Sequence, residues 1–134
     1  MNAHNLTFSK IISSDQGARE HYHVPKYQRE YTWGKWDWER LLQDIEENDP
    51  GYFMGSLICV HDGDPLSPGD EVLFEVVDGQ QRLTTLSLLL LAIYQRLVEL
   101  QSTFEFADDD DRQEFQNTLS SLRNKLVKKK KEGE

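Results

Sequence analysis

The chain has 134 residues, a length that suits one small domain with a modest hydrophobic core. With 37% hydrophobic and 29% charged residues, it is too apolar over most of its length to be disordered. Its net charge of −9 argues against non-specific nucleic-acid binding by this chain alone, because such affinity comes mainly from Lys and Arg.

The sequence also predicts the compartment. Its first residues contain no basic stretch followed by an apolar one, so we expect no signal peptide. The densest apolar run, 86–93, is far shorter than the roughly 20 residues that span a bilayer. Cys59 is the single cysteine, which excludes an internal disulfide and fits a reducing compartment. We therefore expect a cytoplasmic protein without membrane contact.

The predicted elements of the N-terminal part are short. Residues 6–13 fit either a strand or a helical turn, and the pattern does not separate the two. Residues 20–24 alternate as a strand does, and Pro25 ends it. From about Trp36 to Asn48 the sequence predicts an amphipathic helix with Trp38 in the core. The apolar residues at helical spacing are Trp38, Leu41, Leu42 and Ile45.

Two strands flank a loop in the next part. Residues 52–60 predict a continuous apolar strand, in which Gly55 marks a bulge or a close approach of another group to the backbone. Residues 61–71 collect turn formers and acidic side chains, so we expect an exposed loop. Residues 72–78 predict a further strand.

Helices dominate the remaining sequence. Leu83–Gln101 is apolar on most sides, so we expect it to be the buried spine of the domain. Residues 107–126 predict a more polar helix whose acidic start suits the helix dipole. These elements predict an α+β domain, with a short mixed sheet packed on a long buried helix. We expect it to span 1–127 and to be incomplete at its C-terminal end, with 128–134 as a charged tail.

The junction of the last strand and the long helix carries the motif Asp-Gly-Gln-Gln-Arg, residues 78–82. The first N–H groups of a helix have no internal partners and carry partial positive charge, which suits a phosphate. Gly79 lets the backbone turn sharply and approach a ligand, and Arg82 offers a fork of donors to phosphate oxygens. The motif therefore indicates a possible anion site.

Each residue of this junction also has a structural interpretation. Asp78 can hold Mg²⁺ or cap the helix, and Arg82 can bind phosphate or pair with a surface acid. The other polar side chains, which can hydrogen-bond a base, a sugar or a water, are Gln80, Gln81, Thr84 and Thr85, with both threonines expected in the first turn. A glycine turn before a helix does not by itself separate these interpretations.

A second cluster favours the ligand-binding interpretation. Tyr27, Gln28 and Arg29 stand in a non-helical stretch ahead of the first long helix. Arg29 and Arg82 can supply two guanidinium groups to one polyanion, with Tyr27 or Trp33 stacking on a base. We interpret the two clusters as halves of one site.

Three blocks of the sequence together resemble a known family. They are VPKYQREYTWGKWDWERLLQDIEEN, YFMGSLICV and FEVVDGQQRLTTLSLLLLAI, in this order within residues 6–100. The chain is similar here to the N-terminal domain of GmrSD-type restriction endonucleases, which looks like a branch of the ParB/sulfiredoxin-like fold. The Tyr-Gln-Arg and Asp-Gly-Gln-Gln-Arg pair carries the resemblance.

The resemblance implies a function. Such proteins defend against phage by restricting modified DNA: the N-terminal domain binds and hydrolyses a nucleoside triphosphate, and a separate HNH nuclease domain or subunit, not evident in this sequence, cuts the DNA. From the chemistry of Asp78 we expect Mg²⁺ to accompany the nucleotide. By position, the resemblance implies catalytic roles for Asp78, Gln81 and Arg82, with Asp78 also the metal ligand. It implies nucleotide-binding roles for Tyr27, Gln28, Arg29, Gly79 and Gln80, and we expect the hydroxyls of Thr84 and Thr85 to add to the same site.

Other functions remain open at this point. The same pocket can sense a nucleotide or DNA without hydrolysis, or the domain can be a ParB-like nuclease, although Asp78 has no clear acidic partner for a two-metal site. His21 and His23 can share a strand face as metal ligands or simply be exposed. An incomplete domain would leave the Leu83–Leu100 helix uncovered, so we also expect self-association.

Overall fold

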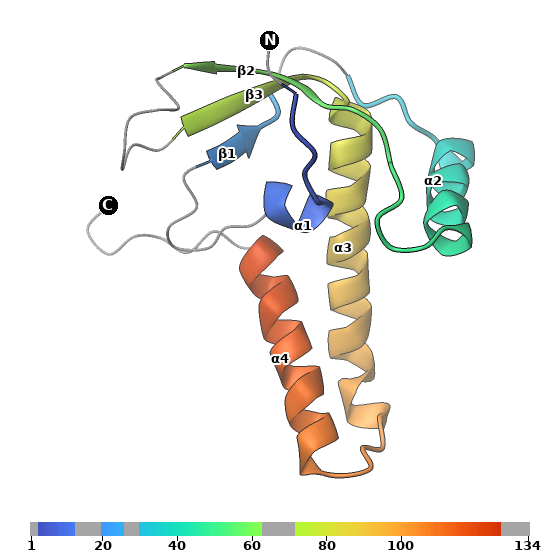
Figure 1. The fold of residues 1–134 in the computed structure, drawn as a ribbon. Helices are drawn as coiled ribbons and strands as arrows, with labels where there is room; N and C mark the ends of the chain where they lie inside the picture. The colour runs from blue at the N-terminus through green and yellow to red at the C-terminus, as the bar shows by residue number, and fades with distance from the viewer. Residues whose placement is uncertain (1–2, 13–19, 26–29, 63–71, 127–134) are drawn as a thin grey trace. The chain divides into compact units, whose positions relative to one another are not determined.

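The computed structural model describes residues 3–12, 20–25, 30–62 and 72–126 of the chain. In chain order its elements are α1 (Phe8–Ile11), β1 (Glu20–His23), α2 (Lys35–Glu47), β2 (Ile58–Asp62), β3 (Val72–Asp78), α3 (Gln80–Leu100), the 3-10 turn η1 (Gln101–Thr103) and α4 (Asp109–Leu126) (Figure 1). The predicted α+β class is confirmed. The ambiguous segment near the N-terminus contains a helical turn, α1.

The sheet is small and mixed, as predicted. Its order is β1-β3-β2, with β1 parallel and β2 antiparallel to the central strand β3. The pairing aligns three rings across the strands: Phe74 stacks on Tyr22 at 5.2 Å and meets the edge of His61 at 5.3 Å. Two residues along β3, Val76 is fully buried. This central strand leads through one glycine into α3.

The chain forms two compact units, and α3 takes part in both. One unit comprises residues 1–7 and 19–85, with the sheet, α2 and the start of α3. The other comprises 8–18 and 86–134, with α1, the rest of α3 and α4. In the second unit, ring contacts of 5.2–6.3 Å join Phe104, Phe106 and Phe115.

The predicted strand 52–60 is displaced in the structure. β2 begins at Ile58 and continues to Asp62, two residues into the segment predicted as a loop. The preceding residues have no regular structure because Gly55 adopts a φ of +126°, which breaks an extended run. Phe53, one of the apolar residues that suggested a strand, is 71% exposed.

The predicted burial of the helices is largely wrong. α3 begins three residues earlier than predicted, and only its first turns reach the core, at Leu83 and Leu86. Farther along α3, exposed apolar side chains include Leu88, Leu91, Ile93 and Val98. In α2, only Leu41 is buried, and Trp38 is 47% exposed rather than in the core. Regular spacing predicted both helices correctly, but an apolar face at helical spacing does not by itself establish that the face is buried.

The apolar segment that contains α3 is longer than the sequence analysis expected. With η1 it forms a segment, Gln80–Thr103, that is long and apolar enough to cross a membrane by length and composition. Core helices of soluble proteins pass the same test. The sequence expectation rested on the uninterrupted run 86–93 alone, whereas the helix continues on both sides of it.

Candidate functional site

The turn between β3 and α3 requires glycine. Gly79 adopts a φ of +83°, and its carbonyl accepts the N–H of Leu83 at 3.2 Å to begin the helix. A Cβ at this position would stand 2.8 Å from the carbonyl oxygen of Ser56 and 2.5 Å from a methyl of Leu57. The close packing of segment 56–57 against the turn therefore fixes the residue type at position 79.

All five residues of the Asp-Gly-Gln-Gln-Arg motif line one hollow of about 230 Å³, which we call the motif hollow. Its other lining residues are Trp33, Ser56 and Val77. The hollow lies where β3 ends and the N–H groups of α3 begin, so its floor combines a helix N-terminus with polar side chains. The structure thus brings the predicted motif residues together at one concave surface.

Asp78 and Arg82 do not adopt the roles that the structural interpretation gave them. Gly79, not Asp78, precedes the first helical residue, and no hydrogen bond of the Asp78 carboxylate is present among the described residues. In the same part of the chain, no carboxylate lies within 4.0 Å of the Arg82 guanidinium. Asp78 is exposed, so its oxygens and the Arg82 donors are both available to a ligand.

Arg82 lies against the backbone of Gly55. A Cβ on Gly55 would overlap the guanidinium, with the Cζ atom only 2.8 Å away. The close approach that the sequence suggested at Gly55 is therefore confirmed, and the approaching group is the arginine of the motif. The Arg82 guanidinium occupies the space that a side chain at position 55 would fill, so its observed position requires glycine there.

Gln81 hydrogen-bonds the segment that precedes α2. Its Oε1 accepts the backbone N–H groups of Thr32 at 2.8 Å and Trp33 at 3.2 Å, and its Nε2 donates to the carbonyl of Glu30 at 3.0 Å. The side chain thus fastens residues 30–33 to the first turn of α3. One Nε2 hydrogen remains after these bonds, and a direct catalytic contact of Gln81 stays a prediction.

A chain of hydroxyls extends this connection to α2. The indole N–H of Trp38 donates to the Tyr31 hydroxyl at 2.8 Å, and that hydroxyl lies 2.6 Å from Thr85 Oγ1. Thr85 in turn donates to the Gln81 carbonyl at 2.7 Å, so Tyr31 must donate to Thr85. Trp38 therefore contributes through its polar edge, which explains why helical spacing alone assigned it wrongly to the core.

Three further predicted residues have mainly structural surroundings. Gln80 is buried and donates to the Val76 carbonyl at 2.8 Å. Thr84 and Thr85 lie in the second turn of α3, not the first, because the helix begins at Gln80. Thr85 is buried, and its hydroxyl is engaged as described above. A nucleotide contact of these three residues stays a prediction.

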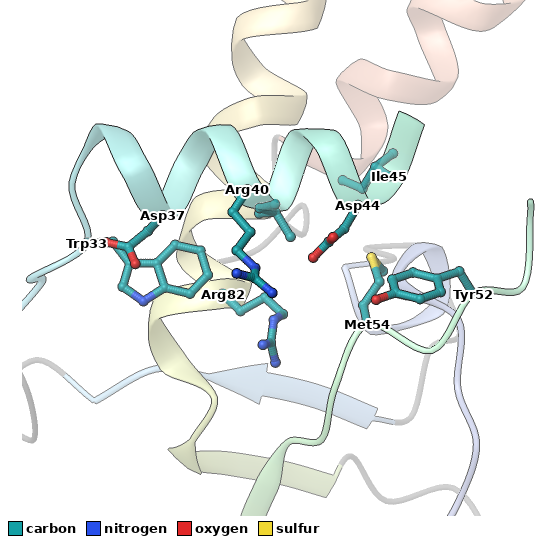
Figure 2. Close-up of a pocket in the computed structure, with 9 residues that line it drawn as sticks. Trp33, Asp37, Arg40, Asp44, Ile45, Tyr52, Met54 and Arg82 are labelled. Carbon is teal, nitrogen blue, oxygen red and sulfur yellow. The ribbon is translucent and has the colours of Figure 1, made fainter. Parts of the chain in front are cut away.

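A second hollow, of about 180 Å³, lies between α2 and residues 52–54, and we call it the α2 hollow (Figure 2). Arg82 and Trp33 line this hollow as well as the motif hollow. The remaining lining residues are Asp37, Arg40, Leu41, Asp44, Ile45, Tyr52 and Met54. Sequence reasoning missed Arg40, whose only signal was its position one turn after Trp36; the two side chains make a cation–π contact at 5.7 Å.

The companion motif cannot be compared with these hollows. Tyr27, Gln28 and Arg29 lie outside the described residues, so their predicted meeting with Arg82 stays a prediction. Within the described ranges, no group of three or more His, Cys, Asp or Glu residues could hold a metal ion. On β1, His23 lies 4.0 Å from Glu75 of β3.

The shifted pKa values in the described chain belong to the sheet rather than to either hollow. Burial raises the pKa of the Tyr22 phenol, and the charges of Glu20 and Cys59 raise it further. Burial also raises the pKa of the Cys59 thiol. Both groups favour their neutral forms, as expected for a small hydrophobe and a stacked ring.

Comparison with known proteins identifies the family. Residues 8–134 match the family model described as GmrSD restriction endonuclease, N-terminal domain. No curated protein and no solved structure matches the chain. The likeness to the ParB/sulfiredoxin-like fold therefore stays a prediction from the sequence.

Proposed function

The chain belongs to the GmrSD restriction endonuclease N-terminal domain family, and from this premise we propose that it binds and hydrolyses a nucleoside triphosphate. Membership makes it a component of a restriction endonuclease. In our proposal it is the regulatory domain of a cytoplasmic phage-defence system that acts on modified DNA. The remainder of the system, including an HNH nuclease, reads and cuts the DNA, which fits the net charge of −9 on this chain.

One observation carries the proposal. The whole Asp-Gly-Gln-Gln-Arg motif lines a hollow at the N-terminus of a 21-residue helix, with an arginine that has no acidic partner among the described residues. Helix N–H groups and a guanidinium fork both favour phosphate oxygens. Trp33, on the rim of the same hollow, offers an aromatic surface for a base.

Asp78 is the residue that fits a magnesium role. Its exposed carboxylate stands at the end of β3 and lines the hollow. Mg²⁺ in nucleotide sites is commonly held by one or two carboxylates together with phosphate oxygens and water, so one protein carboxylate suffices. When bound, the ion would neutralise phosphate charge, while Arg82 would stabilise the charge that develops during phosphoryl transfer.

The proposal predicts a loss of nucleotide affinity in Arg82→Ala. Charged hydrogen bonds contribute about 1.5–3 kcal/mol each, so the dissociation constant should rise by at least about tenfold. Titration calorimetry with each of the four nucleoside triphosphates and Mg²⁺ measures the affinity, and a phosphate-release assay measures turnover. Arg96→Ala is the matched control, because Arg96 lies on the same helix and pairs only with Glu99 at 3.2 Å within the described chain. Wild-type affinity in Arg82→Ala would contradict the proposal.

A specific observation favours a second candidate, a module that senses the nucleotide without hydrolysing it. The Gln81 amide bonds backbone groups through both its oxygen and its nitrogen, which leaves one Nε2 hydrogen and ties the orientation of the side chain to residues 30–33 rather than to an attacking water. Binding without phosphate release, with Mg²⁺ and modified DNA both present, would support this candidate over hydrolysis. A metal-dependent nicking assay tests the ParB-like nuclease alternative, and we expect no cleavage.

A further inference from the structure

The α2 hollow contains two guanidinium groups from different elements. Arg40 extends down from α2, and Arg82 extends from the start of α3 with its guanidinium below that of Arg40 (Figure 2); both side chains line the hollow. Among the described residues, neither guanidinium has a carboxylate within 4.0 Å. The Arg40 guanidinium is instead oriented by the Trp36 ring, 5.7 Å from its centre.

Two like charges directed into one hollow repel each other, and an anion between them turns that repulsion into attraction. We propose that Arg40 is the second guanidinium of the nucleotide site and binds the phosphate chain together with Arg82. This inference rests on the proposed function and adds to it a residue and a direction for the ligand. Guanidinium forks suit phosphate oxygens because each can form two parallel hydrogen bonds.

The direction follows from the residues that the two hollows share. Arg82 and Trp33 line both, so a ligand that starts in the motif hollow reaches the α2 hollow by passing them. We place one end of the phosphate chain at the N–H groups of α3 and the other end at Arg40. Arg82 then contacts the middle of the chain, and an anion joins α2 to the first turn of α3.

Two carboxylates limit which anions this hollow accepts. Asp37 accepts the N–H of Gly34 at 3.0 Å, so part of its charge serves the start of α2. Asp44 lies one turn beyond Arg40, and its carboxylate also faces the hollow (Figure 2). With these acids opposing the two arginines, net charge alone does not attract an anion. Affinity must come from directed hydrogen bonds, which favours a phosphate chain over monovalent ions.

The test compares Arg40→Ala with a control on the same helix. Lys35→Ala is suitable because Lys35 is an exposed cation on α2 that pairs with Glu39 at 3.5 Å and lines neither hollow. Calorimetry on the full-length chain uses each nucleoside triphosphate and inorganic tripolyphosphate, with Mg²⁺ and at constant salt. We expect Arg40→Ala to weaken both kinds of ligand by at least about tenfold, and Lys35→Ala to stay within about twofold.

A second variant separates charge from geometry. Arg40→Lys keeps the charge but loses the fork, so its affinity should fall between those of wild type and Arg40→Ala. Circular dichroism of each variant checks that its total helix content matches that of the wild type. Wild-type affinity in Arg40→Ala, with Arg82→Ala weakened, would overturn this inference and leave the proposed function standing. Weakening for nucleotides but not for tripolyphosphate would also overturn it, and no affinity in the wild type would overturn both proposals.

Discussion

The start of α3 and the helix α4 contain similar polar residues but use them differently. Gln81 bonds residues 48 to 51 positions earlier in the chain, and Thr85 bonds Tyr31, 54 positions earlier. In α4, Gln113 bonds Asn117 and Thr118 bonds the Glu114 carbonyl, each within one turn. Gln81 and Thr85 at the start of α3 fix tertiary structure, whereas Gln113 and Thr118 bond only within their own helix, where the long-range contact comes instead from Lys125 to Ser9 Oγ at 2.5 Å. The motif therefore has an architectural function beside any chemistry.

The largest expected effect comes from a substitution at Gly79, in the turn that positions Gln81 and Thr85 for their long-range hydrogen bonds. Gly79→Ala forces a Cβ into a backbone with a φ of +83° and against the Ser56 carbonyl. We expect a loss of about 3 kcal/mol in the free energy of unfolding, measured by urea denaturation. Gly34→Ala is the control: its φ of −116° and open surroundings accept a Cβ, so the loss should stay below about 1 kcal/mol. Equal losses would show that the turn is not strained by a side chain.

The next largest effect compares Gln81, which bonds distant backbone groups, with Gln113, which bonds a residue of its own helix. Gln81→Ala removes the bonds to the backbone of Glu30, Thr32 and Trp33, so we expect a loss of about 1–2 kcal/mol. Gln113→Ala removes one exposed bond at 3.0 Å and should cost less than about 0.5 kcal/mol. Urea denaturation measures both. A Gln113 variant as unstable as the Gln81 variant would remove the contrast between the two regions.

A smaller effect concerns the hydroxyl chain. Tyr31→Phe removes the oxygen that accepts from Trp38 and donates to Thr85, and about 1 kcal/mol of stability should be lost. Tyr94→Phe serves as the control, since no hydrogen bond of Tyr94 is present in the described chain, and it should be nearly neutral. The same denaturation experiment applies, with tryptophan emission as a second readout because the Trp38 indole loses its acceptor.

The smallest expected effect is on the pH dependence of the free energy of unfolding, through the Cys59 thiol in the sheet. The raised pKa of Cys59 means that the unfolded chain ionises first, near the ordinary value of 9.0. The contribution of this thiol to stability is therefore complete below that pH and is lost as pH rises through the folded-state pKa. We expect Cys59→Ala to flatten the decline of unfolding free energy above pH 9.0. An unchanged pH profile would show that the thiol contributes nothing, and melts at several pH values decide it.

The sequence predicted the elements that local patterns specify. The strand 72–78 agrees with β3 residue for residue, and the periodic segment near 36–48 agrees with α2 to within one residue. It failed where tertiary packing decides. Residues 52–57 are mostly apolar without being a strand, because Tyr52 and Met54 line a hollow and the backbone passes through Gly55 with a positive φ. The middle of α3 is apolar without being buried.

The candidate site was predictable to a similar extent. Spacing around a glycine placed Asp78–Arg82 correctly at one strand–helix junction. It could not reveal that Gln81 serves the backbone of residues 30–33, because long-range hydrogen bonds leave no trace in local sequence. It also could not reveal Arg40, which is one charged residue on a helix with many, until α2 and Arg82 were seen to share a hollow.

Gly55 has a consequence for mutational tolerance. Every amino-acid substitution at this position adds a Cβ where the Arg82 guanidinium lies, and that guanidinium can move away because it ends a flexible side chain. The φ of +126° at Gly55 also strains any other residue, so a variant at position 55 should lose stability in addition to displacing Arg82. A saturation library scored for abundance should therefore tolerate few substitutions at position 55, although glycine itself contributes no side-chain contact.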